Sequence, residues 1–269
     1  SSFDNVYYEV SNEFPGGNTT VEKTYPWALH WARYIKQRTP RLVGVHSHQF
    51  FGMHNIGLNY FMDEPSIDVL TFHAGHETTA DNRPTLMSGL WHPAQTKNKI
   101  LQTNEGMDPY RYGMNAATNH ALSYLMSGAS FALYEDDATR VGSATSLQGS
   151  QRLSVLQSLV AAYSFPALSP VDANGVEYDA LVVAGPAPTW QVLAKPGSRY
   201  AIYFSGLQSA TRARIKVASG SFTCVWIDPR SGAALLKSPC TSSAGIIDTP
   251  APSPGSWDRA AGLLLIITQ

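Results

Sequence analysis

The chain has 269 residues, and its 19 lysine and arginine residues against 20 aspartate and glutamate residues give a formal net charge of −1. This balance gives no electrostatic reason to expect nucleic acid or an anionic membrane as a partner, whereas a neutral partner such as a polysaccharide fits it. The sequence holds no run of about 18 apolar residues, so it predicts no transmembrane helix.

In chain order, the first 166 residues alternate between β-rich runs and helical patterns. The β-rich runs cover residues 6–10, 41–46 and 67–73, a run that starts at Lys99, and residues 129–134. Helices are expected from Pro26, near 56–62, around 85–96, from Asp108-Pro109 to about Met126, and from Ser150 to Pro166. The helical period is clearest in the first of these, at Trp27, Trp31, Tyr34 and Ile35. Five alternations of strand and helix predict a parallel α/β sheet or barrel.

The sequence changes character after residue 166. Short β-rich runs separated by turns follow one another at 200–204, 213–217, 223–227, 233–236 and 262–268. Such runs without intervening helices predict a small antiparallel β-sandwich. We therefore expect two domains, residues 1–166 with the parallel sheet and residues 167–269 with the β-sandwich.

The two cysteines, Cys224 and Cys240, lie on either side of a strong turn signal at residues 228–232. They could face each other across a hairpin and form a disulfide, while two unpaired buried thiols remain the alternative. A disulfide would close a loop of about 15 residues and stabilise the fold by about 3 kcal/mol. It would also indicate a secreted or periplasmic protein.

Two β-rich runs end in the same dipeptide, Asn12-Glu13 after the first run and Asn104-Glu105 after the run that starts at Lys99. Parallel α/β folds gather their chemistry at the carboxyl ends of the strands, so we expect Glu13 and Glu105 to form a paired-carboxylate site. Glycoside hydrolysis is the reaction class that most often uses such a pair.

The order of these elements resembles the second half of a clan A glycoside hydrolase of the apiosidase-like type. The resemblance implies a partial TIM-type (β/α) barrel made of strands 4–8, because only five strand candidates precede the sandwich. It further implies Glu13 as the general acid/base, Asn12 as its sugar-binding neighbour and Glu105 as the nucleophile. The implied activity is retaining, double-displacement hydrolysis of a plant or microbial polysaccharide or oligosaccharide without a cofactor.

The C-terminal part resembles the collagen-binding-type β-sandwich that follows apiosidase-like barrels. The resemblance depends on the hairpin Trp226-Ile227-Asp228-Pro229-Arg230-Ser231-Gly232 and on Trp257-Asp258-Arg259, which precedes the last β-rich run. We expect this domain to cap the barrel, with Trp226 in its core.

All eight histidines precede residue 121, and several follow strands. The candidate substrate-binding residues are His46, His48, His73, His76, Tyr134 and Glu135, which we expect at the same mouth as the two glutamates. Recognition of sugar hydroxyls is the favoured interpretation, with no metal. The alternative is a metal-dependent amidohydrolase-like barrel that uses the His cluster with Asp136 or Asp137.

A half-barrel would leave the strands at 6–10 and 131–134 with one unpaired flank each. We therefore expect a partner, either a second polypeptide that carries barrel strands 1–3 or a second copy of this chain, to complete the barrel. The remaining alternative is a non-catalytic half-barrel or binding remnant.

Overall fold

The computed structural model describes residues 7–11, 20–47, 60–73, 90–91, 93–106, 114–133, 144–171, 181–185, 189–205, 212–252 and 262–269. The helices of its first half are α1 (Val21–Lys36), α5 (Met114–Leu125) and α6 (Ala144–Ala162). The strands are β1 (Tyr8–Glu9), β2 (Val43–Ser47), β3 (Val69–His73), β4 (Ile100–Gly106) and β5 (Ser130–Leu133). Residues 60–62 and 93–96 are also helical, within two of the helices predicted from the sequence.

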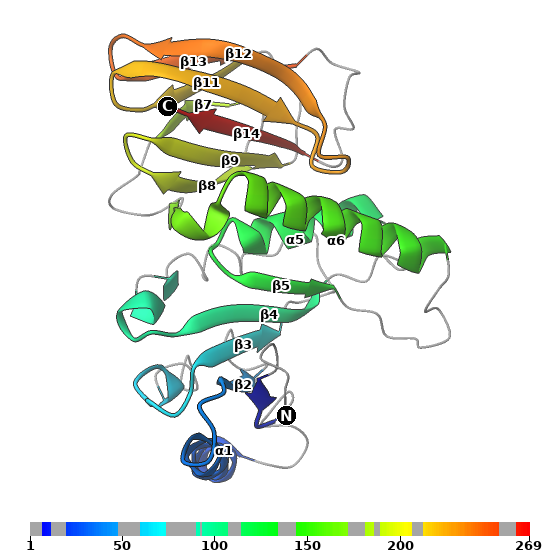
Figure 1. Ribbon diagram of the computed structural model, residues 1–269, viewed down its shortest axis with the longest axis vertical. Helices are drawn as coiled ribbons and strands as arrows, with labels where there is room; N and C mark the ends of the chain where they lie inside the picture. The colour runs from blue at the N-terminus through cyan, green and yellow to red at the C-terminus, as the bar shows by residue number, and fades with distance from the viewer. Residues whose placement is uncertain are drawn as a thin grey trace.

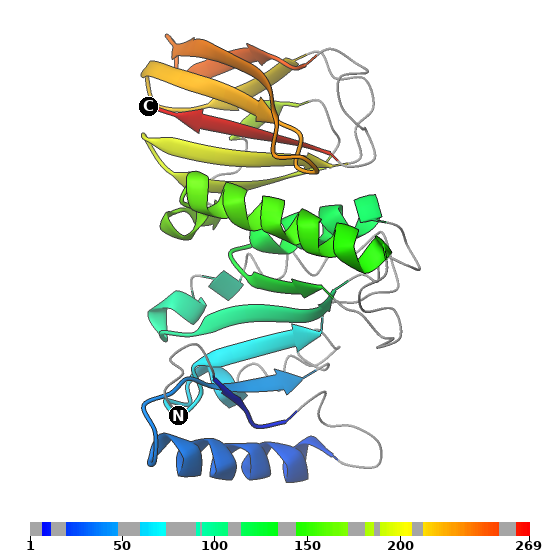
Figure 2. The ribbon, with the colours of Figure 1, turned by 45° about the vertical axis from the view of Figure 1, so that its right-hand side comes forward.

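These five strands form one parallel sheet whose spatial order, β1-β2-β3-β4-β5, follows the order of the chain. The prediction of a parallel α/β sheet from the alternating pattern is therefore confirmed. Figure 2 shows the strands running in the same direction. Within the described part of the chain, β1 pairs only with β2 and β5 only with β4, so both flanks are open. Whether the sheet is part of a barrel stays a prediction.

Helix α1 packs against the sheet through small and apolar side chains. Tyr25, Ala28 and Ala32 lie in one buried cluster with Val43, Val45 and other strand residues. The predicted start of this helix was wrong, because it begins at Val21 and contains Pro26 in its interior.

The aromatic residues whose period predicted α1 lie on its outer side. Trp27, Trp31 and Tyr34 are 49%, 40% and 42% exposed. They contact one another edge-on, and the Arg38 guanidinium lies 3.5 Å from the centre of the Tyr34 ring. The spacing of these aromatic residues thus predicted the helix correctly, but their rings do not face the core.

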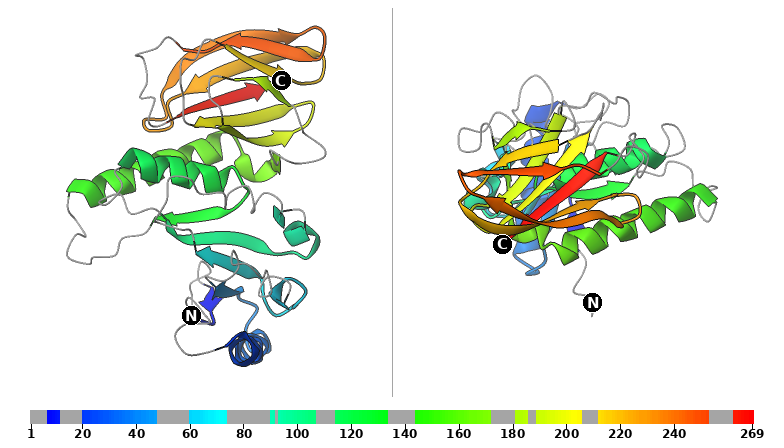
Figure 3. Two further views of the ribbon diagram at one scale, coloured as in Figure 1. Left: turned by 180° about the vertical axis from the view of Figure 1, so that it is seen from behind. Right: turned by 90° about the horizontal axis from the view of Figure 1, so that it is seen from above.

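The second half of the chain consists of antiparallel strands and one short 3-10 helix. They are η3 (Phe165–Ala167), β6 (Ser169–Val171), β7 (Val182–Ala184), β8 (Thr189–Lys195), β9 (Arg199–Ser205), β10 (Arg212–Lys216), β11 (Gly220–Ile227), β12 (Ala234–Ser242), β13 (Ile246–Pro250) and β14 (Leu263–Thr268). One sheet has six strands in the order β12-β11-β14-β9-β8-β6, and the other has three in the order β13-β10-β7. Side chains from both sheets share one apolar core, in which Trp226 is fully buried as expected. Figure 3 shows the two sheets from behind and from above.

The predicted disulfide is confirmed. It joins Cys224 on β11 to Cys240 on β12, with a Cα–Cα distance of 6.0 Å. Cys224 is paired with Ser238 and Cys240 with Phe222, so the bridge runs diagonally between neighbouring strands. The turn between the strands is fixed by an ion pair of Arg230 with Asp228.

The six-stranded sheet uses its other face to dock on α5 and α6, which lie between it and the parallel sheet (Figure 1). Apolar side chains of the two helices, such as Leu122 and Leu156, share a buried cluster with Leu193 and Ile266 of the sheet. At the same interface the Tyr203 hydroxyl donates a hydrogen bond to the Asn119 side chain. The contact between the two halves of the chain is therefore an apolar core with specific polar bonds inside it.

Candidate active site

The second Asn-Glu motif belongs to a strand of the parallel sheet, and the first follows another strand of that sheet in the sequence. Strand β4 extends to Gly106, so the backbone of Asn104 and Glu105 belongs to the strand itself. In β1 the strand ends at Glu9, and Glu13 follows four residues later. Strands β1 and β4 run in the same direction, and Asn104-Glu105 lies at the carboxyl end of β4, whereas Asn12-Glu13 is outside the described residues.

Strand β4 contains an irregularity at the motif. Its pairing with β5 passes from Thr103 opposite Phe131 to Gly106 opposite Leu133. Three steps on β4 therefore match two steps on β5, which places one extra residue, a β-bulge, at positions 104–105. Bulges are common next to active sites, where they redirect side chains. This feature marks Asn104-Glu105 as more than an ordinary stretch of strand.

The structure describes some of the predicted site residues and leaves others outside the described part of the chain. Glu105 and His73 are placed by their backbone on β4 and β3. Asn12, Glu13, His48, His76, Tyr134 and Glu135 lie outside the described residues. The roles assigned to all of these residues, including the catalytic roles of Glu13 and Glu105, therefore stay predictions.

His46 is the one predicted substrate-binding residue whose side chain is described. It lies on β2 with a fully buried ring, and its Nδ1 is 3.8 Å from Oε1 of Glu9. A direct contact of His46 with a sugar stays a prediction. The His46 ring therefore lies next to the Glu9 carboxyl group and is itself buried beneath the protein surface.

A group of polar side chains that the sequence analysis missed surrounds Glu9. The Tyr7 hydroxyl donates to Oε2 of Glu9 at 3.1 Å, and the Thr71 hydroxyl approaches the same oxygen at 3.4 Å. From β4, Nε2 of Gln102 donates to the Tyr7 hydroxyl at 3.1 Å. We call Tyr7, Glu9, Thr71 and Gln102 the Tyr7 network.

Burial affects the ionisation of the Tyr7 network. It raises the pKa of Glu9, and the hydrogen bonds from Tyr7 and Thr71 offset this only in part. Burial and the neighbouring Glu9 charge also raise the pKa of the Tyr7 hydroxyl. The fold therefore favours the neutral form of both groups.

The sequence carries only a partial signal of this network. His46, Thr71 and Gln102 occupy the same register position on β2, β3 and β4, each inside its strand rather than at an end. Polar residues at one register position of three successive parallel strands are unusual, because such strands are mostly apolar. Recognising the row requires the strand register, which the sequence alone does not supply.

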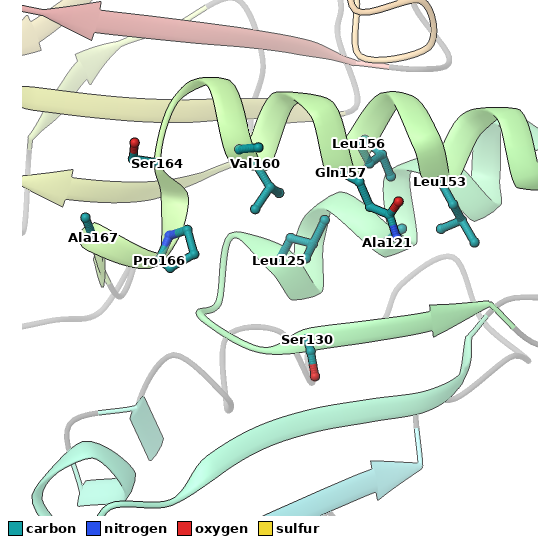
Figure 4. A pocket seen from close by; sticks show the side chains of 11 residues that line it. Ala121, Leu125, Ser130, Leu153, Leu156, Gln157, Val160, Ser164, Pro166 and Ala167 are labelled. Carbon is teal, nitrogen blue, oxygen red and sulfur yellow. The ribbon is translucent and has the colours of Figure 1, made fainter. Parts of the chain in front are cut away.

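A mostly apolar cavity of about 630 Å³ lies at the other end of the sheet. It is lined by side chains of α5 and α6, such as Leu125, Leu153 and Val160, and by Ser130, the first residue of β5 (Figure 4). Chemistry in parallel α/β folds is found at the carboxyl ends of the strands, so this cavity at the start of β5 is not the candidate active site.

In the part of the chain that the structure describes, no group of three or more His, Cys, Asp or Glu residues is placed to hold a metal ion. His48 and His76, on which the metal alternative depends, are outside that part. None of the described helices is both long and apolar enough to cross a membrane.

No protein-family model matches the chain, and no curated protein matches it significantly. Among solved structures, the α-L-arabinofuranosidase from Thermotoga maritima, in complex with arabinose, is 13% identical with a TM-score of 0.50. The match covers 98% of this chain and 66% of that one. Another arabinofuranosidase is 12% identical with a TM-score of 0.49, over 94% of this chain and 63% of its own.

A family 51 α-L-arabinofuranosidase from Bifidobacterium longum is 8% identical with a TM-score of 0.38, over 97% of this chain and 66% of its own. At these identities the likeness concerns the fold alone, and of these three structures only the one from Thermotoga, with a TM-score of 0.50, supports an inference. The chain spans less than two thirds of the length of each of these three structures. The apiosidase-like and collagen-binding-type assignments stay predictions.

Proposed function

We propose that the chain is part of a retaining glycoside hydrolase, with Glu13 as general acid/base and Glu105 as nucleophile. The observation that carries this proposal is the placement of β1 and β4 in one parallel sheet, because in the sequence an Asn-Glu dipeptide follows β1 and another lies at the end of β4. The bulge at positions 104–105 and the fold likeness to the Thermotoga arabinofuranosidase support it. The proposed substrate is a plant or microbial polysaccharide or oligosaccharide.

The proposed reaction has two steps. In the first, the Glu105 carboxylate attacks the anomeric carbon and the bond to the leaving oxygen breaks, while Glu13 gives its proton to that oxygen. The product is a glycosyl ester on Glu105. In the second step Glu13 takes a proton from a water molecule whose oxygen attacks the same carbon, which releases the sugar and restores both carboxyl groups.

We propose further that the five-stranded sheet represents strands 4–8 of a (β/α) barrel, and that a β-sandwich caps it. The open flanks of β1 and β5 support this, because parallel sheets are nearly always covered and closure removes exposed edges. Barrel strands 1–3 on a further polypeptide, or a second copy of this chain that pairs its open edges with these, would cover both flanks.

Secretion or export to the periplasm is part of the same proposal. It is supported by the Cys224–Cys240 disulfide, since disulfides persist mainly in oxidising compartments.

The proposal is tested by assaying the chain, together with the partner that completes its barrel, on a panel of aryl glycosides that includes an α-L-arabinofuranoside. We expect Glu13→Gln and Glu105→Gln each to abolish hydrolysis without loss of fold. The matched control is Asp63→Asn, which removes an exposed carboxylate that pairs with Lys97 at the surface.

Azide distinguishes the two roles. It should rescue Glu105→Ala and give a glycosyl azide of inverted configuration, as expected for a missing nucleophile. The two carboxyl groups should lie roughly 5–5.5 Å apart in a liganded crystal structure. Wild-type activity in both glutamine variants, or a separation well beyond about 9 Å, would rule out the paired-carboxylate mechanism.

A further inference from the structure

Strand β1 is held to the sheet by few backbone contacts, although it leads into one of the two Asn-Glu motifs. It has two residues and pairs only with β2 among the described strands. Backbone hydrogen bonds run from the Tyr8 amide to the Leu42 carbonyl at 2.9 Å and from the Val10 amide to the Gly44 carbonyl at 3.0 Å. A strand this short at the edge of a sheet frays easily unless side chains hold it.

The side chain of Tyr7 supplies such a hold by lying across β2. A Cβ atom on Gly44 would be 3.0 Å from Cε2 of Tyr7 and 3.2 Å from Cβ of Val69. These distances are too short for comfortable contact, so the absence of a side chain at Gly44 makes room for the ring. The ring remains 36% exposed, which places it at the surface of the sheet rather than in a core.

The polar atoms of the Tyr7 network extend from β1 to strands that β1 does not touch through its backbone. Glu9 accepts a hydrogen bond from Thr71 on β3, and the Tyr7 hydroxyl accepts one from Gln102 on β4. Strands β1 and β4 are three positions apart, or about 14 Å in a flat sheet. Tyr7 and Gln102 therefore form a direct link across two intervening strands.

We propose that the Tyr7 network positions β1 relative to β4 and thereby sets the spacing between the strand that precedes Glu13 and the strand that carries Glu105. Tyr7 and Gln102 are positioning residues, because they act through these two strands. This inference rests on the proposed function, in which the two Asn-Glu motifs carry the acid/base and the nucleophile. Misplacing reactive groups by about 1 Å is enough to slow an enzyme by about a hundredfold.

The test compares three variants that weaken the link in different ways. Tyr7→Phe removes the hydroxyl, Gln102→Leu removes its donor, and Gly44→Ala fills the space that the ring occupies. The control is Tyr8→Phe, which removes the hydroxyl of the neighbouring exposed tyrosine on β1.

We expect each of the three variants to lower kcat by about ten- to a hundredfold at an unchanged KM. Tyr8→Phe should keep wild-type values. Because Tyr7→Phe and Gln102→Leu break the same bond, the double variant should be no worse than the more affected single variant. A merely structural role would lower the amount of folded protein, measured by far-UV circular dichroism, without changing kcat per folded molecule.

Amide hydrogen exchange provides a measurement that does not depend on turnover. Exchange at Tyr8 and Val10 should become about five- to tenfold faster in Tyr7→Phe and Gln102→Leu, as the loss of one hydrogen bond implies. The Asp68 amide, bonded to the Val43 carbonyl between β2 and β3, is the internal reference and should not change.

The outcomes separate the inference from the proposed function. If Glu13→Gln and Glu105→Gln are inactive but Tyr7→Phe and Gln102→Leu keep wild-type kcat and exchange rates, the positioning role is overturned and the proposed function stands. If the two glutamine variants remain active, the proposed function is wrong and the positioning role falls with it. Unchanged exchange at Tyr8 and Val10 would overturn the link itself in either case.

Discussion

Glu9 is a half-buried carboxyl group whose pKa lies above its usual range, because burial outweighs the hydrogen bonds from Tyr7 and Thr71. A carboxyl group with a raised pKa in the folded state stabilises the fold below its unfolded pKa, and this contribution is lost as the pH rises through the folded value. Glu9→Gln remains neutral and keeps an oxygen that accepts hydrogen bonds. We therefore expect this variant to melt at a higher temperature than the wild type at pH 8 and to differ less from it at pH 4.

For a second glutamate, Glu64, we expect the opposite dependence of stability on pH. Burial alone would raise the pKa of Glu64, but hydrogen bonds from Arg33 and Ser66 lower it below its usual value. Glu64→Gln should therefore destabilise the protein at pH 7, and the difference should shrink as the pH falls through the folded pKa. Differential scanning calorimetry between about pH 2 and pH 8 measures both variants, because the change expected for Glu64 falls below its usual pKa. A Glu9→Gln variant that loses more stability at pH 8 than at pH 4 would contradict the explanation for Glu9.

At the scale of secondary-structure elements, a separate prediction concerns the disulfide in the hairpin of β11 and β12. Cys224 and Cys240 are 16 positions apart, so breaking their bridge releases a loop whose closure stabilises the fold by about 3 kcal/mol. We expect the Cys224→Ala/Cys240→Ala double variant to unfold at a lower denaturant concentration than the oxidised wild type. A reductant should lower the wild-type midpoint and leave the double variant unchanged. Two titratable thiols in the non-reduced, denatured wild type would contradict the bridge.

Most helices and strands could be predicted from the local sequence pattern. Which side of each element is buried, and which elements pack against it, could not. The five strands of the parallel sheet and the disulfide follow from β-rich runs, turn signals and cysteine spacing. Trp27 and Trp31 show the limit, because their period is helical but their burial depends on what packs beside α1. Strand β12 was predicted only at 233–236, because its second half contains polar residues and Pro239.

The candidate site could be predicted only in its motifs. Asn104-Glu105 is visible because the dipeptide ends a β-rich run, but the bulge in β4 depends on the pairing with β5. Tyr7 and Gln102 are 95 positions apart in the chain, and each alone is an ordinary strand residue. Their link depends on strand register and on the missing side chain of Gly44, neither of which is a local property of the sequence.

At the scale of the whole molecule, the two halves are joined by the apolar cluster between the six-stranded sheet and the helices α5 and α6. The hydroxyl of Tyr203 is fully buried there, and burial raises its pKa far above the usual range. Tyr203→Phe removes its bond to Asn119 and should cost about 1–3 kcal/mol of unfolding free energy. Because the cluster is shared, unfolding should remain a single transition when fluorescence and far-UV circular dichroism are followed together.

Tyr200→Phe serves as the control for that prediction. The Tyr200 hydroxyl accepts a hydrogen bond from the Gly197 amide, within the six-stranded sheet and its connecting turn. This variant should lower stability without changing binding between the two halves when they are produced as separate polypeptides. Tyr203→Phe should weaken that binding, and equal binding in both variants would contradict the assigned interface role of Tyr203.

The position of β14 has a consequence for how the chain folds during synthesis. This last described strand lies between β9 and β11, in the middle of the six-stranded sheet. Until residues 263–268 have left the ribosome, the pairs on either side of β14 share no backbone hydrogen bonds. The parallel sheet is different, because each of its strands pairs with the strand made just before it, so it can form progressively as the chain emerges. The six-stranded sheet is therefore completed only when β14 joins its two groups of strands, and until then the open edges of β9 and β11 are the surfaces of the nascent chain that need protection from aggregation.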